Sequence, residues 1–144
     1  MFNKFYIHTD GGARGNPGPA GIGIIIEDEQ GKIILKKSKF LGTKTNNQAE
    51  YEALVLAFKE AKKLKAKNLE IFSDSELLVG QMSSGWKVRS NNVKSLHIKA
   101  RELLDNFDSV VFRGVPREEN KGADKLVNEA IDNKIKNVKF KKES

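Results

Sequence analysis

The chain has 144 residues, enough for one domain with a hydrophobic core. Lysine and arginine number 26 against 19 acidic residues, and the resulting net charge of +7 favours a polyanionic partner such as nucleic acid. There is no cysteine, which excludes disulfides and Cys-ligated zinc or iron–sulfur sites. No stretch resembles a secretion signal or is apolar enough to span a bilayer, so we expect a cytoplasmic protein without membrane association.

Three runs of β-forming residues open the chain. Residues 4–9 predict a central strand, because apolar side chains occupy both of its faces until Asp10. Residues 10–21 are rich in glycine and proline and predict a rigid, exposed loop. Residues 22–27 and 32–41 predict two further strands, and the short turn between them indicates an antiparallel meander.

The hydrophobic period then becomes helical. Residues 47–65 predict a long amphipathic helix, and residues 69–73 predict a fourth strand. A strand, a crossover helix and another strand indicate that the first and fourth strands pair in parallel.

The C-terminal part adds helices and one more strand. The predicted segments are a short helix at 75–82, a linker at 83–91, helices at 92–107 and 122–134, a strand at 109–115, and a lysine-rich tail at 135–144. The whole pattern predicts an α/β fold, with one domain at 1–134 whose mixed sheet is flanked by helices.

Four acidic residues stand where burial disfavours a charge. Asp10 and Asp74 both follow strands predicted to be parallel neighbours, so their carboxylates should emerge side by side at one edge of the sheet. Glu50 lies on the apolar stripe of the long helix and faces the sheet, and Asp124 begins the last helix.

Each acid also has a purely structural interpretation. Asn47 and Glu50 fit a capping box, Asp74 could cap the helix that follows it, and Asp124 could be a first-turn acid favoured by the helix dipole. However, four carboxylates that converge on one site repel strongly unless cations neutralise them.

The chemistry of such a cluster is that of a hard divalent cation. Oxygen ligands without cysteine suit Mg²⁺, with Mn²⁺ as a possible substitute. Two such ions, roughly 3.5–4 Å apart, activate a water molecule and stabilise the leaving oxygen when a phosphodiester is cleaved. This mechanism needs no covalent nucleophile, and the sequence has only two histidines and no Ser-His-Asp spacing.

Four motifs in order resemble those of type 1 ribonuclease H over essentially the whole chain. They are Thr9-Asp10-Gly11 with Gly15-Asn16-Pro17-Gly18, then Asn46-Asn47-Gln48-Ala49-Glu50, Ser73-Asp74-Ser75 and Asn120-Lys121-Gly122-Ala123-Asp124. The resemblance implies a ribonuclease H-like catalytic domain with a five-stranded sheet in the order 3-2-1-4-5. It also implies endonucleolytic cleavage of the RNA strand of an RNA/DNA hybrid, which leaves 5′-phosphate and 3′-hydroxyl ends.

The resemblance also assigns roles to residues. It implies that Asp10, Glu50, Asp74 and Asp124 are the catalytic, metal-binding acids. The residues implied to contact the hybrid are Gly11, Gly12, Gly15, Asn16, Thr45, Asn46, Asn47 and Asn92. Amide side chains and loop N–H groups suit this role, because they can read the 2′-hydroxyl and the backbone of RNA.

Two features depart from the family pattern. Many members carry a histidine in the loop before the last acid, whereas this chain has Val-Pro-Arg there and resembles a variant subfamily. Arg117 cannot act as a general base because its pKa is too high, but it can neutralise phosphate charge. Residues 85–93 are shorter than the basic handle of some bacterial members, although Trp86, Lys87, Arg89 and Lys94 could still contact a nucleic-acid backbone. Trp86 could equally be a packing residue.

Two other functions stay open on the sequence alone. The four acids do not determine whether the cleaved strand is RNA or DNA, so a nuclease of the same fold could act on DNA. A basic module that binds hybrids without cleaving them is the second alternative, and its binding would depend on salt but little on divalent metal. We expect the protein to be a monomer, whichever of these functions it has.

Overall fold

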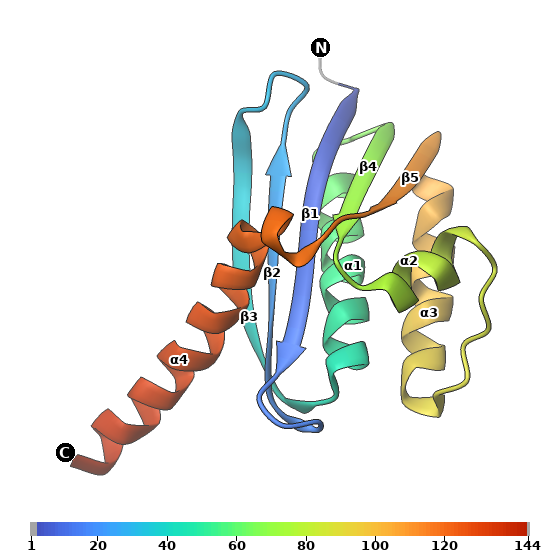
Figure 1. Cartoon of the computed structure of the whole chain (residues 1–144). Helices are drawn as coiled ribbons and strands as arrows, with labels where there is room; N and C mark the ends of the chain where they lie inside the picture. The colour runs from blue at the N-terminus through green and yellow to red at the C-terminus, as the bar shows by residue number, and fades with distance from the viewer. Residues whose placement is uncertain (1–2, 144) are drawn as a thin grey trace.

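The computed structural model describes residues 3–143, with side chains from 3 to 135. Its centre is a five-stranded sheet in the order β3-β2-β1-β4-β5, which confirms the order implied by the family resemblance (Figure 1). The strands are β1 (Lys4–Ala13), β2 (Gly18–Glu27), β3 (Ile33–Lys44), β4 (Asn68–Ser73) and β5 (Ser109–Gly114).

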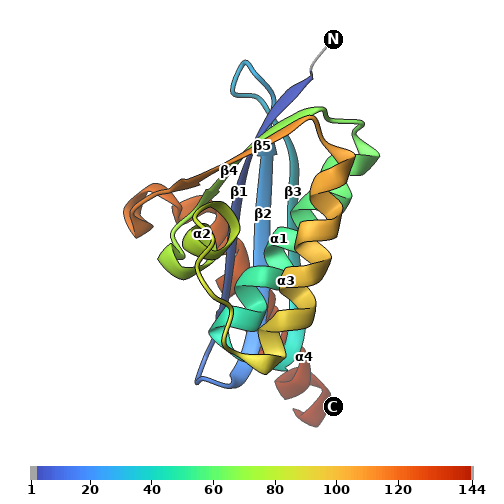
Figure 2. The ribbon, with the colours of Figure 1, turned by 90° about the vertical axis from the view of Figure 1, so that its right-hand side faces the viewer.

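Helices cover both faces of the sheet. They are α1 (Asn46–Lys63), α2 (Glu76–Ser83), α3 (Asn91–Leu103) and α4 (Lys121–Glu143), with short 3-10 turns η1 (Leu104–Asn106) and η2 (Arg117–Glu119). α1 and α3 pack side by side on one face, whereas α4 crosses β2 and β3 on the other (Figures 1 and 2). None of the helices in the described part of the chain is both long enough and apolar enough to cross a membrane.

The direction of pairing changes at β1. β1 runs antiparallel to β2, with Asp10 opposite Gly23, and parallel to β4, with His8 opposite Phe72. β4 and β5 are also parallel, and β2 and β3 are antiparallel. The predicted crossover is therefore confirmed: α1 carries the chain from the antiparallel meander to the strand on the other side of β1.

The core lies between the sheet and α1. Ile7, Ile24 and Ile71 of three neighbouring strands are fully buried, and Leu54 and Phe58 of α1 are fully buried against them. Each such side chain contributes about 1.5–3 kcal/mol by leaving water. This packing fixes α1 against the sheet and thereby sets the position of every polar group at its N-terminus.

Several predicted boundaries differ from the structure: the predicted helix at 92–107 ends at Leu103, the predicted strand at 32–41 continues to Lys44, and two other differences affect the site or the end of the chain. β1 extends through Gly11 and Gly12 to Ala13, because β2 pairs with it along that whole length, so the glycine-rich loop is shorter than predicted. The last helix does not end at Lys134 but continues to Glu143, which includes most of the predicted tail. No glycine or proline follows Gly122, so nothing in the sequence stops this helix.

Candidate active site

Three of the four predicted acids meet at one point of the sheet. Ligand oxygens of Asp10, Glu50 and Asp74 all lie within 4.8 Å of one another. Asp10 belongs to β1, Glu50 to the first turns of α1, and Asp74 follows the last residue of β4. Together with Asp124 they line a cavity of about 530 Å³. The β1-α1-β4 unit thus brings together carboxylates that are far apart in sequence.

Glu50 faces this cavity because a different residue pair caps α1. The predicted box of Asn47 and Glu50 is wrong: the Thr45 hydroxyl accepts from the Gln48 N–H, and the Gln48 side chain accepts from the Thr45 N–H. Threonine at the cap and glutamine three residues later form a capping box equally well. Glu50 instead accepts a hydrogen bond from the Gly11 N–H at 2.5 Å.

Gly11 makes this contact possible. A Cβ at Gly11 would lie 2.3 Å from the carbonyl carbon of Ala49, inside the backbone of α1. Only a residue without a side chain lets strand and helix approach so closely. Asp10 and Gly11 therefore have separate structural roles: Asp10 contributes a carboxylate to the cluster, and Gly11 admits the helix that carries Glu50.

The other two acids are fixed by their neighbours. Asp74 is not the cap of α2, because the Ser75 hydroxyl accepts the N–H of Leu78 and performs that function. Asp124 lies in the first turn of α4, as the dipole interpretation predicted, and it also lines the cavity. The start of α4 is tied to β1 by the buried Asn120, whose side-chain amide donates to the Thr9 carbonyl at 2.9 Å.

The acids stand in an unfavourable electrostatic environment. Burial, together with the charge of Asp74, raises the pKa of Asp10 from 3.8 to about 7. Burial and the charge of Asp10 raise the pKa of Glu50 well above its usual value. Burial also raises the pKa of Asp74, although Arg117 opposes this shift. Oxygen donors that hold their protons so strongly fit a site for hard divalent cations, which would replace those protons.

Comparison with known proteins places this site in a family. The family model described as reverse transcriptase-like matches residues 8–130. The chain is 37% identical to ribonuclease HI of Halobacterium salinarum over 90% of its length and 65% of that protein. The crystal structure of RNase H1 from the same archaeon superposes with a TM-score of 0.87 and is covered to 98%. The chain belongs to the ribonuclease H type 1 family.

Two further relatives of this ribonuclease H chain differ in length and context. A bifunctional protein of Mycobacterium tuberculosis is 41% identical over 90% of the chain, which spans only 36% of that protein. LC11-RNase H1, crystallised in complex with an RNA/DNA hybrid, is 43% identical and superposes with a TM-score of 0.87. The match covers 91% of the present chain and 99% of LC11-RNase H1. The chain thus spans about a third to two thirds of the first curated relatives.

The eight residues that the family resemblance implies to contact the hybrid fall into two groups. Gly11, Gly12, Asn46 and Asn47 line the cavity with the acids. The remaining four, which do not line it, are Gly15, Asn16, Thr45 and Asn92.

Of those four, Asn16 and Asn92 make side-chain hydrogen bonds, and Gly15 has a turn conformation. Asn16 accepts from the Asn46 N–H at 3.0 Å, while the Asn46 side chain accepts from the Ala13 N–H at 2.8 Å. Asn16 and Asn46 therefore join the tip of the β1-β2 hairpin to α1. Gly15 takes the φ of +90° that this turn requires. Asn92, in the first turn of α3, contacts the Ser90 hydroxyl.

Two arginines bring positive charge to this ribonuclease H cavity. Arg117 lines it beside the acids. Arg14 was not predicted: its guanidinium crosses to α4 and contacts Asp132 at 2.6 Å and Asn128 at 3.3 Å. Its position in the glycine-rich loop makes Arg14 a candidate cation, but no local pattern specifies its contact with α4.

His8 and Trp86 both pack against neighbouring side chains or backbone. His8 stacks on Phe72 with ring centroids 4.8 Å apart and contacts Glu27 at 3.3 Å. Trp86 lies against α2, where a Cβ at Gly80 would be 2.1 Å from its ring, but 48% of Trp86 stays exposed. Neither residue lines the cavity of the acids.

Proposed function

We propose that this chain is an endonuclease that hydrolyses the RNA strand of RNA/DNA hybrids with two Mg²⁺ ions, and that it leaves 5′-phosphate and 3′-hydroxyl ends. The observation that carries the proposal is the cluster of Asp10, Glu50 and Asp74, whose ligand oxygens lie within 4.8 Å in a chain of the ribonuclease H family. Mn²⁺ can substitute for Mg²⁺, because both prefer oxygen ligands.

The residues of the chain have distinct tasks in this reaction. Asp10, Glu50, Asp74 and Asp124 would hold the ions. When bound, such ions supply a nucleophilic water and neutralise the charge that develops on the leaving oxygen. The Gly11 N–H holds the Glu50 carboxylate in place at 2.5 Å, so this ligand is oriented before an ion binds.

The hybrid is recognised beside the acids. Asn46 and Asn47 present amide groups at the N-terminus of α1, and Gly11 and Gly12 allow a backbone to approach the strand closely. Donors and acceptors of this kind distinguish a 2′-hydroxyl from a hydrogen, which separates RNA from DNA. The complex of LC11-RNase H1 with an RNA/DNA hybrid supports this substrate.

Arg117 neutralises the phosphate next to the cleaved bond. It lines the same cavity as the acids, and its charge opposes the rise that burial causes in the pKa of Asp74, so this charge acts within the site. The guanidinium stays charged at every working pH and therefore cannot exchange protons with the substrate. In this loop no residue replaces the histidine that many other family members carry before the last acid.

The test is cleavage of an end-labelled hybrid with and without Mg²⁺. We expect the RNA strand alone to be cut, only with metal, and not by Asp10→Asn, whose circular dichroism spectrum should match that of the wild type. Cleavage of duplex DNA would favour the DNA nuclease instead. Salt-dependent hybrid binding with no cleavage would indicate the non-catalytic module. Normal cleavage by Asp10→Asn would refute the proposed site.

A further inference from the structure

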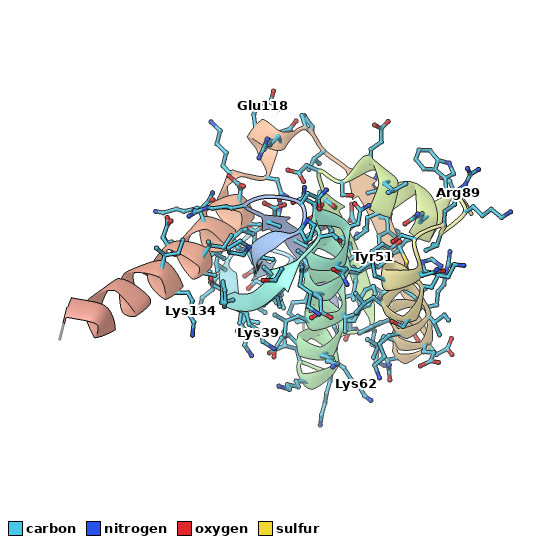
Figure 3. All side chains as sticks on the ribbon, turned by 90° about the horizontal axis from the view of Figure 1, so that it is seen from below. Lys39, Tyr51, Lys62, Arg89, Glu118 and Lys134 are labelled. Carbon is cyan, nitrogen blue, oxygen red and sulfur yellow. The ribbon has the colours of Figure 1, made fainter. Side chains whose placement is uncertain are left out.

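The segment between α2 and α3, residues 84–90, lies outside regular structure but is firmly attached to α2. The N–H groups of Ser84 and Trp86 both donate to the carbonyl of Gly80, at 2.9 and 3.1 Å. Beyond Trp86 the segment leaves the helix and presents Lys87 and Arg89. Figure 3 shows Arg89 at the outer edge of the molecule, away from the sheet.

One buried side chain holds the segment beyond that point. Gln81 of α2 is 4% exposed, and its side-chain amide donates to the Lys87 carbonyl at 3.1 Å. Its side-chain oxygen accepts from the Tyr51 hydroxyl at 2.7 Å, and its backbone carbonyl accepts from Arg101 at 2.8 Å. Gln81 therefore connects α1, α2 and α3 to the segment through bonds of good geometry.

The chain of hydrogen bonds continues into α3. The His97 Nδ1 lies 3.3 Å from the Tyr51 hydroxyl, and the Arg101 Nε lies 3.5 Å from the His97 Nε2. Burial and the nearby Arg101 lower the pKa of His97, so the ring is neutral near pH 7. A proton on Nδ1 then lets His97 donate to Tyr51 while Tyr51 donates to Gln81. Figure 3 shows Tyr51 between α1 and α3, where this network lies.

The segment walls a second cavity next to the catalytic one. This cavity, of about 300 Å³, is lined by Lys87 and Arg89, by Asn47 of α1, and by apolar side chains of α2 and α3. Among the described residues that line it, none carries a carboxylate. Asn47 also lines the cavity of the four acids, so the two cavities are neighbours. A nucleic-acid strand bound at the acids would therefore pass these cations.

We propose that Gln81 is a positioning residue for hybrid binding: it fixes the backbone at Lys87 so that Lys87 and Arg89 meet the phosphates of the bound hybrid. The inference rests on the proposed function, because it takes the substrate from there. Gln81 borders the second cavity but is only 4% exposed. It acts through the Lys87 carbonyl, and Tyr51 holds Gln81 in the orientation that this bond requires.

The experiment measures hybrid binding and turnover separately. Gln81→Leu and Tyr51→Phe each remove one part of the network at similar volume. We expect either change to raise KM for the hybrid about 5–10-fold, the factor that corresponds to one lost hydrogen bond. The kcat should stay within about twofold of the wild-type value, because the acids are untouched. In the Asp10→Asn background, where nothing is cleaved, fluorescence anisotropy should show the same 5–10-fold rise in Kd.

Two controls separate positioning from lost stability. Ile26→Val shortens a fully buried side chain far from the segment and should lower Tm without changing KM. Arg89→Ala should weaken hybrid binding in the wild type but much less in Gln81→Leu. In Gln81→Leu the segment is already displaced, so Arg89 no longer contacts the hybrid and its removal has little further effect.

The outcomes distinguish the two proposals. An unchanged KM and Kd in Gln81→Leu, or additive effects with Arg89→Ala, would overturn the positioning role while hybrid cleavage by the wild type stands. Failure of the wild type to cleave hybrid would instead overturn the proposed function. A fall in kcat at constant KM would also contradict the inference, since it would place Gln81 in the chemistry rather than in binding.

Discussion

Replacing Asp10 by asparagine should make the metal-free protein more stable while it removes activity. In the folded state burial and the charge of Asp74 raise the pKa of Asp10 to about 7, whereas in the unfolded chain it is near 3.8. The folded protein therefore binds a proton more tightly than the unfolded chain. Stability must then fall as pH rises from about 4 to 7 and stay at the lower value above that range.

The size of this effect follows from the shift. A change from 3.8 to about 7 corresponds to at most about 4 kcal/mol of lost stability at pH 8. Asparagine keeps the shape of the side chain but carries no charge, so the variant should recover about 2–4 kcal/mol. For a domain of this size, about 3 °C in Tm accompanies each kcal/mol, which predicts a rise of roughly 6–12 °C.

Thermal unfolding followed by circular dichroism in EDTA measures this difference. At pH 8 Asp10→Asn should melt above the wild type, and at pH 5 the gap should fall to less than half, since the wild-type carboxyl is then largely protonated. Added Mg²⁺ should raise the wild-type Tm at pH 8 and leave the variant nearly unchanged. A variant that is no more stable than the wild type at pH 8, or a gap independent of pH, would refute the electrostatic reasoning.

Three other substitutions test separate parts of the structure. Gly11→Ala places a methyl group inside the backbone of α1 and should cost at least about 3 kcal/mol in chemical denaturation, whereas Gly12→Ala, whose Cβ would meet only an ordinary contact at 3.7 Å, should cost under about 1 kcal/mol. Glu70→Gln should cost about 1 kcal/mol at pH 7, and this cost should vanish near pH 3, because ion pairing with Arg113 lowers the pKa of Glu70 and that stability is lost as pH falls through it. Arg117→Ala should raise KM for hybrid about threefold to tenfold in steady-state assays, with recovery in Arg117→Lys if charge alone matters; an unaffected KM would exclude a phosphate contact.

The sequence predicted the parts of the site that depend on topology. The acids at 10 and 74 lie together because two strands pair in parallel, and residue 50 joins them because the hydrophobic stripe of α1 orients it; both rules operate at the level of whole elements. The relative positions of whole strands and helices can be predicted correctly even when their predicted ends are wrong by a few residues.

Details that depend on single contacts could not be predicted. The capping box lies at Thr45 and Gln48, two residues before the pair that the sequence suggested, because both candidate pairs satisfy the same local rule. The contact of Arg14 with α4 joins residues 118 positions apart, and no local pattern specifies it. The hydrogen bonds of Asn16 and Asn46 between the β1-β2 hairpin and α1 likewise form only because the folded hairpin packs beside the helix.

The hydrogen bond from Asn120 to Thr9 joins parts of the chain 111 positions apart. During synthesis the β1-α1-β4 unit emerges with three acids before Asp124 and the wall formed by α4. The complete cavity therefore exists only in the fully folded chain, and any local opening that releases α4 dismantles it. The site of the proposed nuclease activity is in this way tied to global folding cooperativity, so that partly folded forms carry the acids without the enclosed site.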